Sequence, residues 1–147
     1  MPPVNIQPEH HFTRQISSGR LKRRDDGVVY GCFPQAFLMR ENESELSGSW
    51  LEYFQGTRRD QMRQTVFAIR AMGMTVRPRD GLSVSNVAQF HSTCAEFGVR
   101  VRILHEPAKD NPNPAYATVR NLVRDNMELL ALLAVACVEV AEVSTIV

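Results

Sequence analysis

Hydrophobic positions recur along the chain at two different spacings, and each spacing predicts a different kind of element. Within 58–72 the apolar residues Met62, Val66 and Ile69 recur three and four positions apart, as on one face of a helix. The segment 57–60 reads Thr-Arg-Arg-Asp, which fits the capping box that begins many helices. We therefore predict a helix over 58–72.

A second helix and a strand follow in the same way. Ser85 is a favourable N-cap, Val87 and Phe90 mark a buried helix face, and Gly98 is a residue that commonly ends a helix. Residues 99–105 then alternate between apolar and polar or larger side chains, which is typical of a strand. Because that alternation leaves one face of a sheet wet, it favours an α+β fold over a doubly wound sheet.

The last part of the chain is rich in Leu, Ala and Val, and its pattern predicts one long helix over about 116–142. The uninterrupted apolar run 129–138 would leave this helix apolar nearly all the way round. Such a helix is either a central core element or an interface for self-association or another protein. Both alternatives stay open here, and the interface residues expected in the second case are Leu129, Leu130, Leu133 and Val140.

The remaining segments complete the expected architecture. Strands are predicted at 11–16 and within 28–39, while 1–10, with three prolines, is expected to be a loose N-terminal segment. Residues 11–147 form a single domain in this interpretation. The expected fold is α+β (or a small α/β fold), with a small mixed sheet, two flanking mid-chain helices and the long apolar C-terminal helix.

Composition narrows the function classes. The 147 residues are 44% hydrophobic and 22% charged, as in ordinary globular domains, and the net charge of +1 gives no global attraction to nucleic acid or acidic lipid. No signal peptide and no apolar run long enough to span a membrane occur, so a cytoplasmic, bacterial-type protein is expected. Arginines outnumber lysines by 15 to two. Arginine-mediated nucleic-acid binding is therefore a weaker alternative, although acids flank each arginine cluster.

Cysteines and histidines give no metal motif. Cys32, Cys94 and Cys137 are odd in number and lack Cys-x-x-Cys spacing, which argues against a disulfide framework or a zinc site and indicates buried free thiols. The histidines lack His-x-x-x-His spacing as well. We predict neither a metal nor another cofactor.

Four residues are candidates for chemistry if the fold brings them together in a cleft. His11 and His105 can exchange protons near neutral pH, and Arg14 and Arg40 can bind phosphate. This set predicts, as an alternative function, a small enzyme or toxin-like domain that acts on RNA or a nucleotide. A structural role for His105 at the end of its strand is the competing interpretation.

The segment 45–56, ELSGSWLEYFQG, contains the only tryptophan. Trp50 has apolar neighbours and is expected to anchor a loop to the core. Exposed aromatic side chains would instead make Trp50, Tyr53 and Phe54 binding hot spots. We expect Glu52 and Tyr53 to face outward.

This segment also carries a resemblance. Ser47, Trp50, Leu51 and Glu52, together with the later His-Glu-Pro at 105–107, resemble a scattered family of small uncharacterised bacterial proteins. In that family a leucine-serine-x-x-tryptophan-leucine-glutamate segment is paired with a late strand that ends in His-acid-Pro before a proline-rich loop. That loop usually ends in Ser-His, and in this chain Tyr116 stands where the histidine would be expected. The resemblance implies no activity.

Taken together, these patterns favour a protein-interaction or subunit function over an enzyme. The expected surfaces are the C-terminal helix and the Trp50 segment, and the expected partner is a second copy of the chain or another protein.

Overall fold

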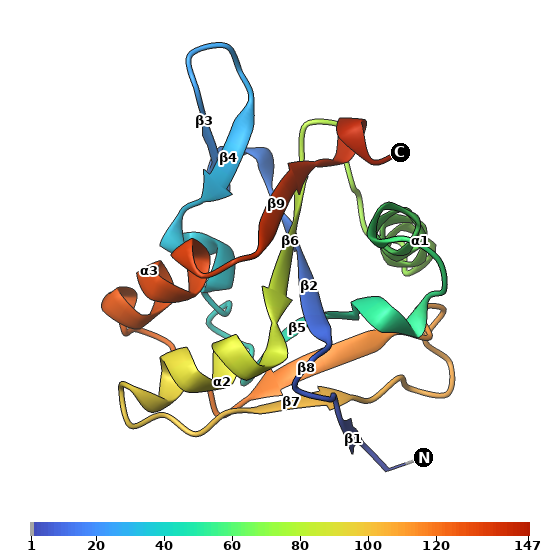
Figure 1. Cartoon of the computed structure of the whole chain (residues 1–147). Helices are drawn as coiled ribbons and strands as arrows, with labels where there is room; N and C mark the ends of the chain where they lie inside the picture. Colours follow the sequence, from blue (N-terminus) through green and yellow to red (C-terminus); the bar gives the residue numbers. More distant parts are fainter. Residues whose placement is uncertain (1) are drawn as a thin grey trace.

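A computed structural model describes residues 2–147, and a seven-stranded antiparallel sheet organises the chain (Figure 1). All pairings between the described strands are antiparallel, so the α+β class is confirmed, whereas the sheet is not mixed. In spatial order the strands are β1 (Val4–Asn5), β7 (Arg102–His105), β8 (Tyr116–Arg120), β5 (Glu45–Trp50), β2 (His11–Ile16), β6 (Gly81–Asn86) and β9 (Glu139–Glu142). A separate hairpin consists of β3 (Leu21–Arg23) and β4 (Val29–Cys32).

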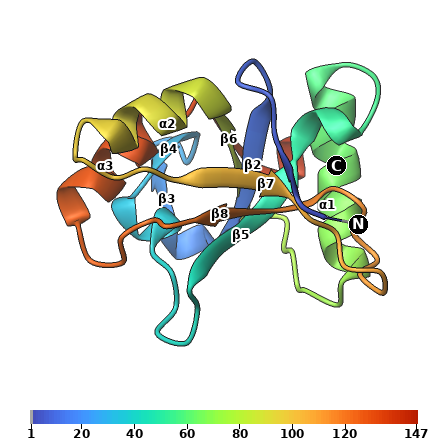
Figure 2. The same cartoon turned by 90° about the horizontal axis from the view of Figure 1, so that it is seen from below.

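Three helices cover the two faces of the sheet. The helices are α1 (Arg58–Ala71), α2 (Val87–Ala95) and α3 (Met127–Val135). The first lies on one side of the β2–β6–β9 strands, while the other two lie together on the opposite side (Figure 1 and Figure 2). This division produces two apolar clusters, one beneath α1 and a larger one beneath α2 and α3. None of the helices within residues 2–147 has both the length and the apolar character needed to cross a membrane.

Local sequence signals fix the start of the first two helices. Thr57 and Asp60 form the reciprocal capping box, which confirms the predicted start of α1. For α2 the predicted N-cap was one residue early. Ser85 belongs to β6, and the side chain of Asn86 accepts the hydrogen bond from the Gln89 backbone N–H at 2.9 Å.

The prediction of one long helix over 116–142 is wrong. That range contains β8, then the nine-residue helix α3, and then β9. Asn121, with a φ of 69°, turns the chain out of β8, and the side chain of Asn126 caps α3 by accepting from the Leu129 N–H. Strand β8 lies between β7 and β5, so its backbone groups form ladders on both edges, and Tyr116, Thr118 and Val119 are residue types that favour a strand.

The N-terminal segment is also more ordered than expected. Strand β1 pairs with β7, and the backbone N–H of Ile6 donates to the Ile103 carbonyl at 3.0 Å. Ile6 is buried in the larger apolar cluster. Within the predicted loose segment 1–10, residues 4–10 are therefore tied to the folded domain by strand pairing and backbone hydrogen bonds, and Met1 lies outside the described residues.

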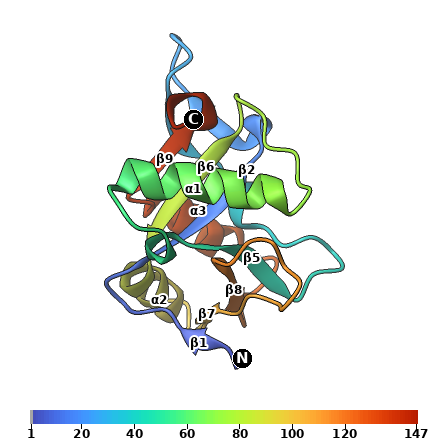
Figure 3. The same cartoon turned by 90° about the vertical axis from the view of Figure 1, so that its right-hand side faces the viewer.

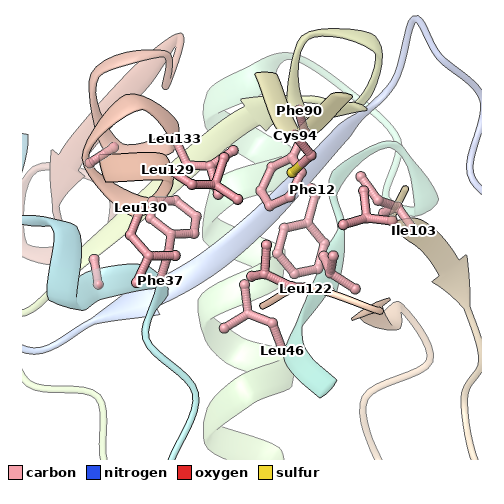
Figure 4. Packing of buried hydrophobic residues seen from close by; sticks show 14 of the residues in the cluster. Phe12, Phe37, Leu46, Phe90, Cys94, Ile103, Leu122, Leu129, Leu130 and Leu133 are labelled. Carbon is pink, nitrogen blue, oxygen red and sulfur yellow. The ribbon is translucent and has the colours of Figure 1, made fainter. Parts of the chain in front are cut away.

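The larger cluster contains the leucines that were predicted as interface residues from the sequence. Leu129, Leu130 and Leu133 point from α3 toward Phe37 and Phe90, in a core centred on Phe12 (Figure 4). None of the three leucines is more than 2% exposed. The apolar run was expected to be either a core element or an interface, and these three side chains belong to the core.

The sheet consists of two parts that are joined over a short distance. Strands β2 and β5 pair at only two positions, Phe12 with Trp50 and Thr13 with Ser49. Beyond Thr13 the two strands separate, and Figure 1 and Figure 3 show β2 and β6 running in a different direction from β7 and β8. The separation leaves space beside the remainder of β2, and the candidate site lies there.

Candidate functional site

A cavity of about 640 Å³ lies where β2 and β5 separate. One wall comes from the C-terminal end of α1 and the loop after it, a second from the segments after β2 and before β5, and the floor from β5 and the segment that enters β8. The polar and charged part of the lining, together with Gly48, includes Arg14, Arg20, Arg40, Glu43, Ser47, Gly48, Ser49, Asn113 and Tyr116. A volume of this size accommodates a ligand as large as a nucleotide.

Arg14 occupies the gap between the separated strands. Its Nε donates to the carbonyl of Ala36 at 2.8 Å, and its Nη1 donates to the carbonyl of Ser47 at 2.5 Å. Ala36 belongs to a short 3₁₀ helix, η2 (Pro34–Phe37), so the guanidinium bridges two elements. Within residues 2–147 these bonds use two of the five N–H groups of the guanidinium, which leaves the others for a ligand.

The charge of Arg14 has no ion-pair partner in the described part of the chain. Burial lowers the pKa of Arg14 to about 10; Glu43 acts in the opposite direction, and Arg20 and Arg40 add to the lowering. The guanidinium nevertheless keeps its proton at neutral pH. A desolvated cation whose only partners are uncharged backbone carbonyls attracts an anion.

The rest of the charge around the cavity is also mainly positive. Arg20 and Arg40 line it with Arg14, and Glu43 is the acidic residue among the described lining residues. Arg40 is 81% exposed in its side chain and lies 3.9 Å from Glu43, so this ion pair is a weak surface contact. Arg20 donates to the Gln35 carbonyl at 2.9 Å. Three cations against one anion give the cavity a local formal charge of +2.

The floor of the cavity is polar and rigid. Ser47, Gly48 and Ser49 belong to β5, so strand pairing holds the backbone of the floor. The side-chain amide of Asn113 donates to the hydroxyl of Ser49 at 3.0 Å, and both residues are buried. Burial, and to a smaller extent nearby acids, raise the pKa of Tyr116. The hydroxyl therefore stays protonated and able to donate a hydrogen bond.

A second group of side chains, here termed the histidine–aromatic cluster, consists of His10, His11, Trp50, Glu52, Tyr53 and His105. The indole N–H of Trp50 donates to His10 Nδ1 at 3.1 Å, and the rings of Trp50 and His105 lie 5.0 Å apart between centroids. Glu52 accepts from the His11 backbone N–H at 2.8 Å and lies 2.5 Å from His11 Nδ1. These contacts tie the N-terminal part of β2 to the end of β5.

The four chemical candidates do not converge on one cleft. Arg14 and Arg40 line the cavity, whereas His11 and His105 belong to the histidine–aromatic cluster and do not appear among its described lining residues. His105 donates from Nε2 to the carbonyl of Pro114 at 2.8 Å, because a carbonyl can only accept. The structural interpretation of His105, as a strand-end residue bonded to a loop carbonyl, is confirmed.

Several residues of both groups were missed from sequence. Glu52 was expected to face outward, but it is half-buried against His11. Arg20 and Tyr116 were not predicted to be site residues, and they line the cavity. Their roles depend on which strands are neighbours, and no local pattern records this.

The proposed interface residues also fall into two groups. Trp50 and Val140 are half-buried and pack against the larger core cluster, as the anchor interpretation of Trp50 predicted. Tyr53 is exposed and Phe54 half-buried. The exposed apolar side chains of the α3 region differ from those predicted and are Met127, Leu132, Val135 and Val138. Partner binding through this region stays a prediction.

Comparison of the chain with protein-family models, with curated proteins and with solved structures finds no match. The resemblance drawn from the Trp50 segment therefore stays a prediction. Within residues 2–147 no group of three or more His, Cys, Asp or Glu side chains is placed to hold a metal ion.

Proposed function

We propose that this protein binds a phosphate-bearing small molecule of nucleotide size in the cavity beside β2, with Arg14 contacting the phosphate. The observation that carries the proposal is the Arg14 guanidinium, which lies in the cavity wall, donates to two backbone carbonyls and has no ion pair among residues 2–147. A buried charge is costly without a partner, and a bound anion would supply that partner.

The chemistry of the lining residues supports phosphate as the anion. A guanidinium presents its N–H groups in a planar fork that matches two phosphate oxygens. Arg20 and Arg40 are close enough to Arg14 to affect its pKa, so several phosphate oxygens could be contacted at once. The hydroxyls of Ser47 and Tyr116 offer neutral donors beside the cations.

The shape of the cavity supports a small molecule over a nucleic-acid chain. Ile69 and Met72 at the end of α1, with Met74 beyond it, supply an apolar wall on which a ring could pack. The polar floor and the arginines then face the opposite, charged part of the ligand. Such a division between an apolar body and a few polar contacts is usual for small-molecule sites.

Calorimetric titration with ADP, pyrophosphate and inorganic phosphate tests this proposal. The wild-type protein is expected to bind at least one of these probes. In Arg14→Gln the loss of a charged hydrogen bond worth about 1.5–3 kcal/mol should weaken that binding by about ten- to more than a hundredfold. Binding should also weaken as the salt concentration rises.

Two further variants make the result interpretable. Arg40→Gln removes an exposed cavity charge, so its fold should be unaffected while the affinity falls. Arg100→Gln removes an exposed charge outside the described cavity lining and should leave the affinity unchanged. The proposal is wrong if the wild type binds none of the three probes at millimolar concentration. It is equally wrong if folded Arg14→Gln and Arg40→Gln bind as well as Arg100→Gln.

A further inference from the structure

Two of the three cysteines meet in the structure although they are more than 100 positions apart in the sequence. Cys32 ends β4, and Cys137 follows α3 just before β9. Strand β4 packs against both α3 and β9. Cys32 is part of the larger apolar cluster, and Cys137 packs against that cluster. A side-chain hydrogen bond from the Cys32 thiol to Cys137 shifts the pKa of both groups, which places the two side chains beside each other at this cluster.

The two thiols differ in their surroundings. Cys32 is buried, with 3% of its surface exposed, whereas Cys137 is half-buried. The Cys137 sulfur also lies 3.6 Å from the Ser85 hydroxyl and 3.6 Å from the Leu133 carbonyl. The hydrogen bond from Cys32 lowers the pKa of Cys137, while the same bond and burial raise that of Cys32. Cys137 is thus the accessible thiol with the larger thiolate fraction.

We propose that Cys32 and Cys137 are a redox pair, which a peroxide converts to an intramolecular disulfide between β4 and the segment joining α3 to β9. Both cysteines are free in the structure, which corresponds to the reduced form. An odd number of cysteines without Cys-x-x-Cys spacing speaks against a disulfide framework, whereas a reversible pair needs only two thiols that the fold brings together.

The reaction requires one peroxide and proceeds in two steps. The Cys137 thiolate attacks one oxygen of hydrogen peroxide, the O–O bond breaks, and a sulfenic acid and hydroxide form. The sulfur of Cys32 then attacks the sulfenic sulfur, the S–S bond forms and the S–O bond breaks. The departing hydroxide and the proton of Cys32 leave as water, and two electrons have passed from the two sulfurs to the peroxide.

The third cysteine provides a matched internal control. Cys94 lies in α2, is fully buried, and burial raises its pKa to about 11. It is therefore a poor thiolate at neutral pH and is expected to stay reduced. Its position in the same protein means that oxidation of the pair and general damage by peroxide can be told apart in one sample.

The experiment is oxidation of the full chain with a small excess of hydrogen peroxide, followed by intact mass spectrometry and non-reducing peptide mapping. The expected product has lost the mass of two hydrogen atoms, carries a Cys32–Cys137 crosslink, and regains the original mass with dithiothreitol. In Cys32→Ser the sulfenic acid on Cys137 should persist and be trapped by dimedone. Cys94→Ala should form the crosslink as the wild type does.

Three results would overturn the proposal. The first is a folded protein that keeps three free thiols under these conditions. The second is a Cys137 that gains oxygen atoms while Cys32 stays a thiol in the wild-type chain. The third is a disulfide that joins two chains. Each can be read from the wild type alone, so the conclusion does not depend on whether a cysteine variant folds, or on whether the cavity binds phosphate.

Discussion

Replacement of Leu130 by Ala is the sharpest test of how α3 is placed. Leu130 is fully buried and points into the larger cluster, whereas Leu132, on the same helix two positions later, is 42% exposed. The two substitutions remove the same atoms from the same helix. A difference between their effects therefore reports packing and not helix propensity.

The expected magnitude follows from the atoms removed. Leu→Ala deletes three carbon groups, each worth about 0.8 kcal/mol when buried, which gives about 2.4 kcal/mol of lost transfer free energy. The cavity left among Phe37 and its neighbours adds to this, so the free energy of unfolding should fall by about 3–5 kcal/mol for Leu130→Ala. For Leu132→Ala the expected loss is about 1 kcal/mol or less, because much of its side chain is already in water.

Urea denaturation with an unchanged m value measures both losses, and light scattering on a sizing column measures the mass of each variant. Leu130→Ala should also lower the melting temperature by about 10 °C, while both variants keep the wild-type mass. Equal losses for Leu130→Ala and Leu132→Ala would refute the core placement. So would a change in mass without a change in stability for Leu130→Ala, which would identify Leu130 as an interface residue.

Two further predictions concern the sheet and its acid stability. At Gly48 a Cβ atom would overlap the Thr13 carbonyl oxygen and come within 2.6 Å of the Phe12 ring, so Gly48→Ala should cost about 3 kcal/mol in chemical denaturation. Gly19→Ala, where a Cβ meets nothing within 4 Å, should be nearly neutral, and equal costs would contradict the close approach of β2 and β5. Hydrogen bonds from Ser144 and then Arg23 lower the pKa of Glu142 below its usual 4.5. This interaction stabilises the fold above pH 4.5 and is lost as the pH falls through the lowered value, so Glu142→Gln should cost about 1 kcal/mol or less at pH 7. Thermal melts from pH 7 to pH 2.5 should show this difference shrink, and a constant difference would exclude the proposed linkage.

The candidate site shows how far residue types alone can lead. Arginine chemistry pointed to Arg14 and Arg40 as phosphate ligands, and both line the cavity. The same argument grouped them with His11 and His105, which lie in the histidine–aromatic cluster instead. Spacing along the chain carries no information on which strands are neighbours, so only the folded sheet could separate the two sets.

The sequence by itself determined the elements that are stabilised locally. The capping box at Thr57 and Asp60, with the apolar period that follows, was sufficient for α1, and the extended segment 11–16 is β2. These signals are local because the hydrogen bonds and the buried face involve residues within a few positions of each other. The α+β class follows from the same elements.

Only the tertiary structure decided the rest. The helix-favouring residues of the range 116–142 lie mainly in 127–136. Tyr116–Arg120 contains Tyr, Thr and Val, which suit a strand, and it is extended because it forms a ladder with a neighbouring strand on each edge. Asn121 and Asn126 were the available signals for that break. The contact of Cys32 with Cys137 and the exposure of Arg14 to the cavity likewise arise between distant segments, since both depend on how β4, β9, β2 and β5 are placed by the sheet as a whole.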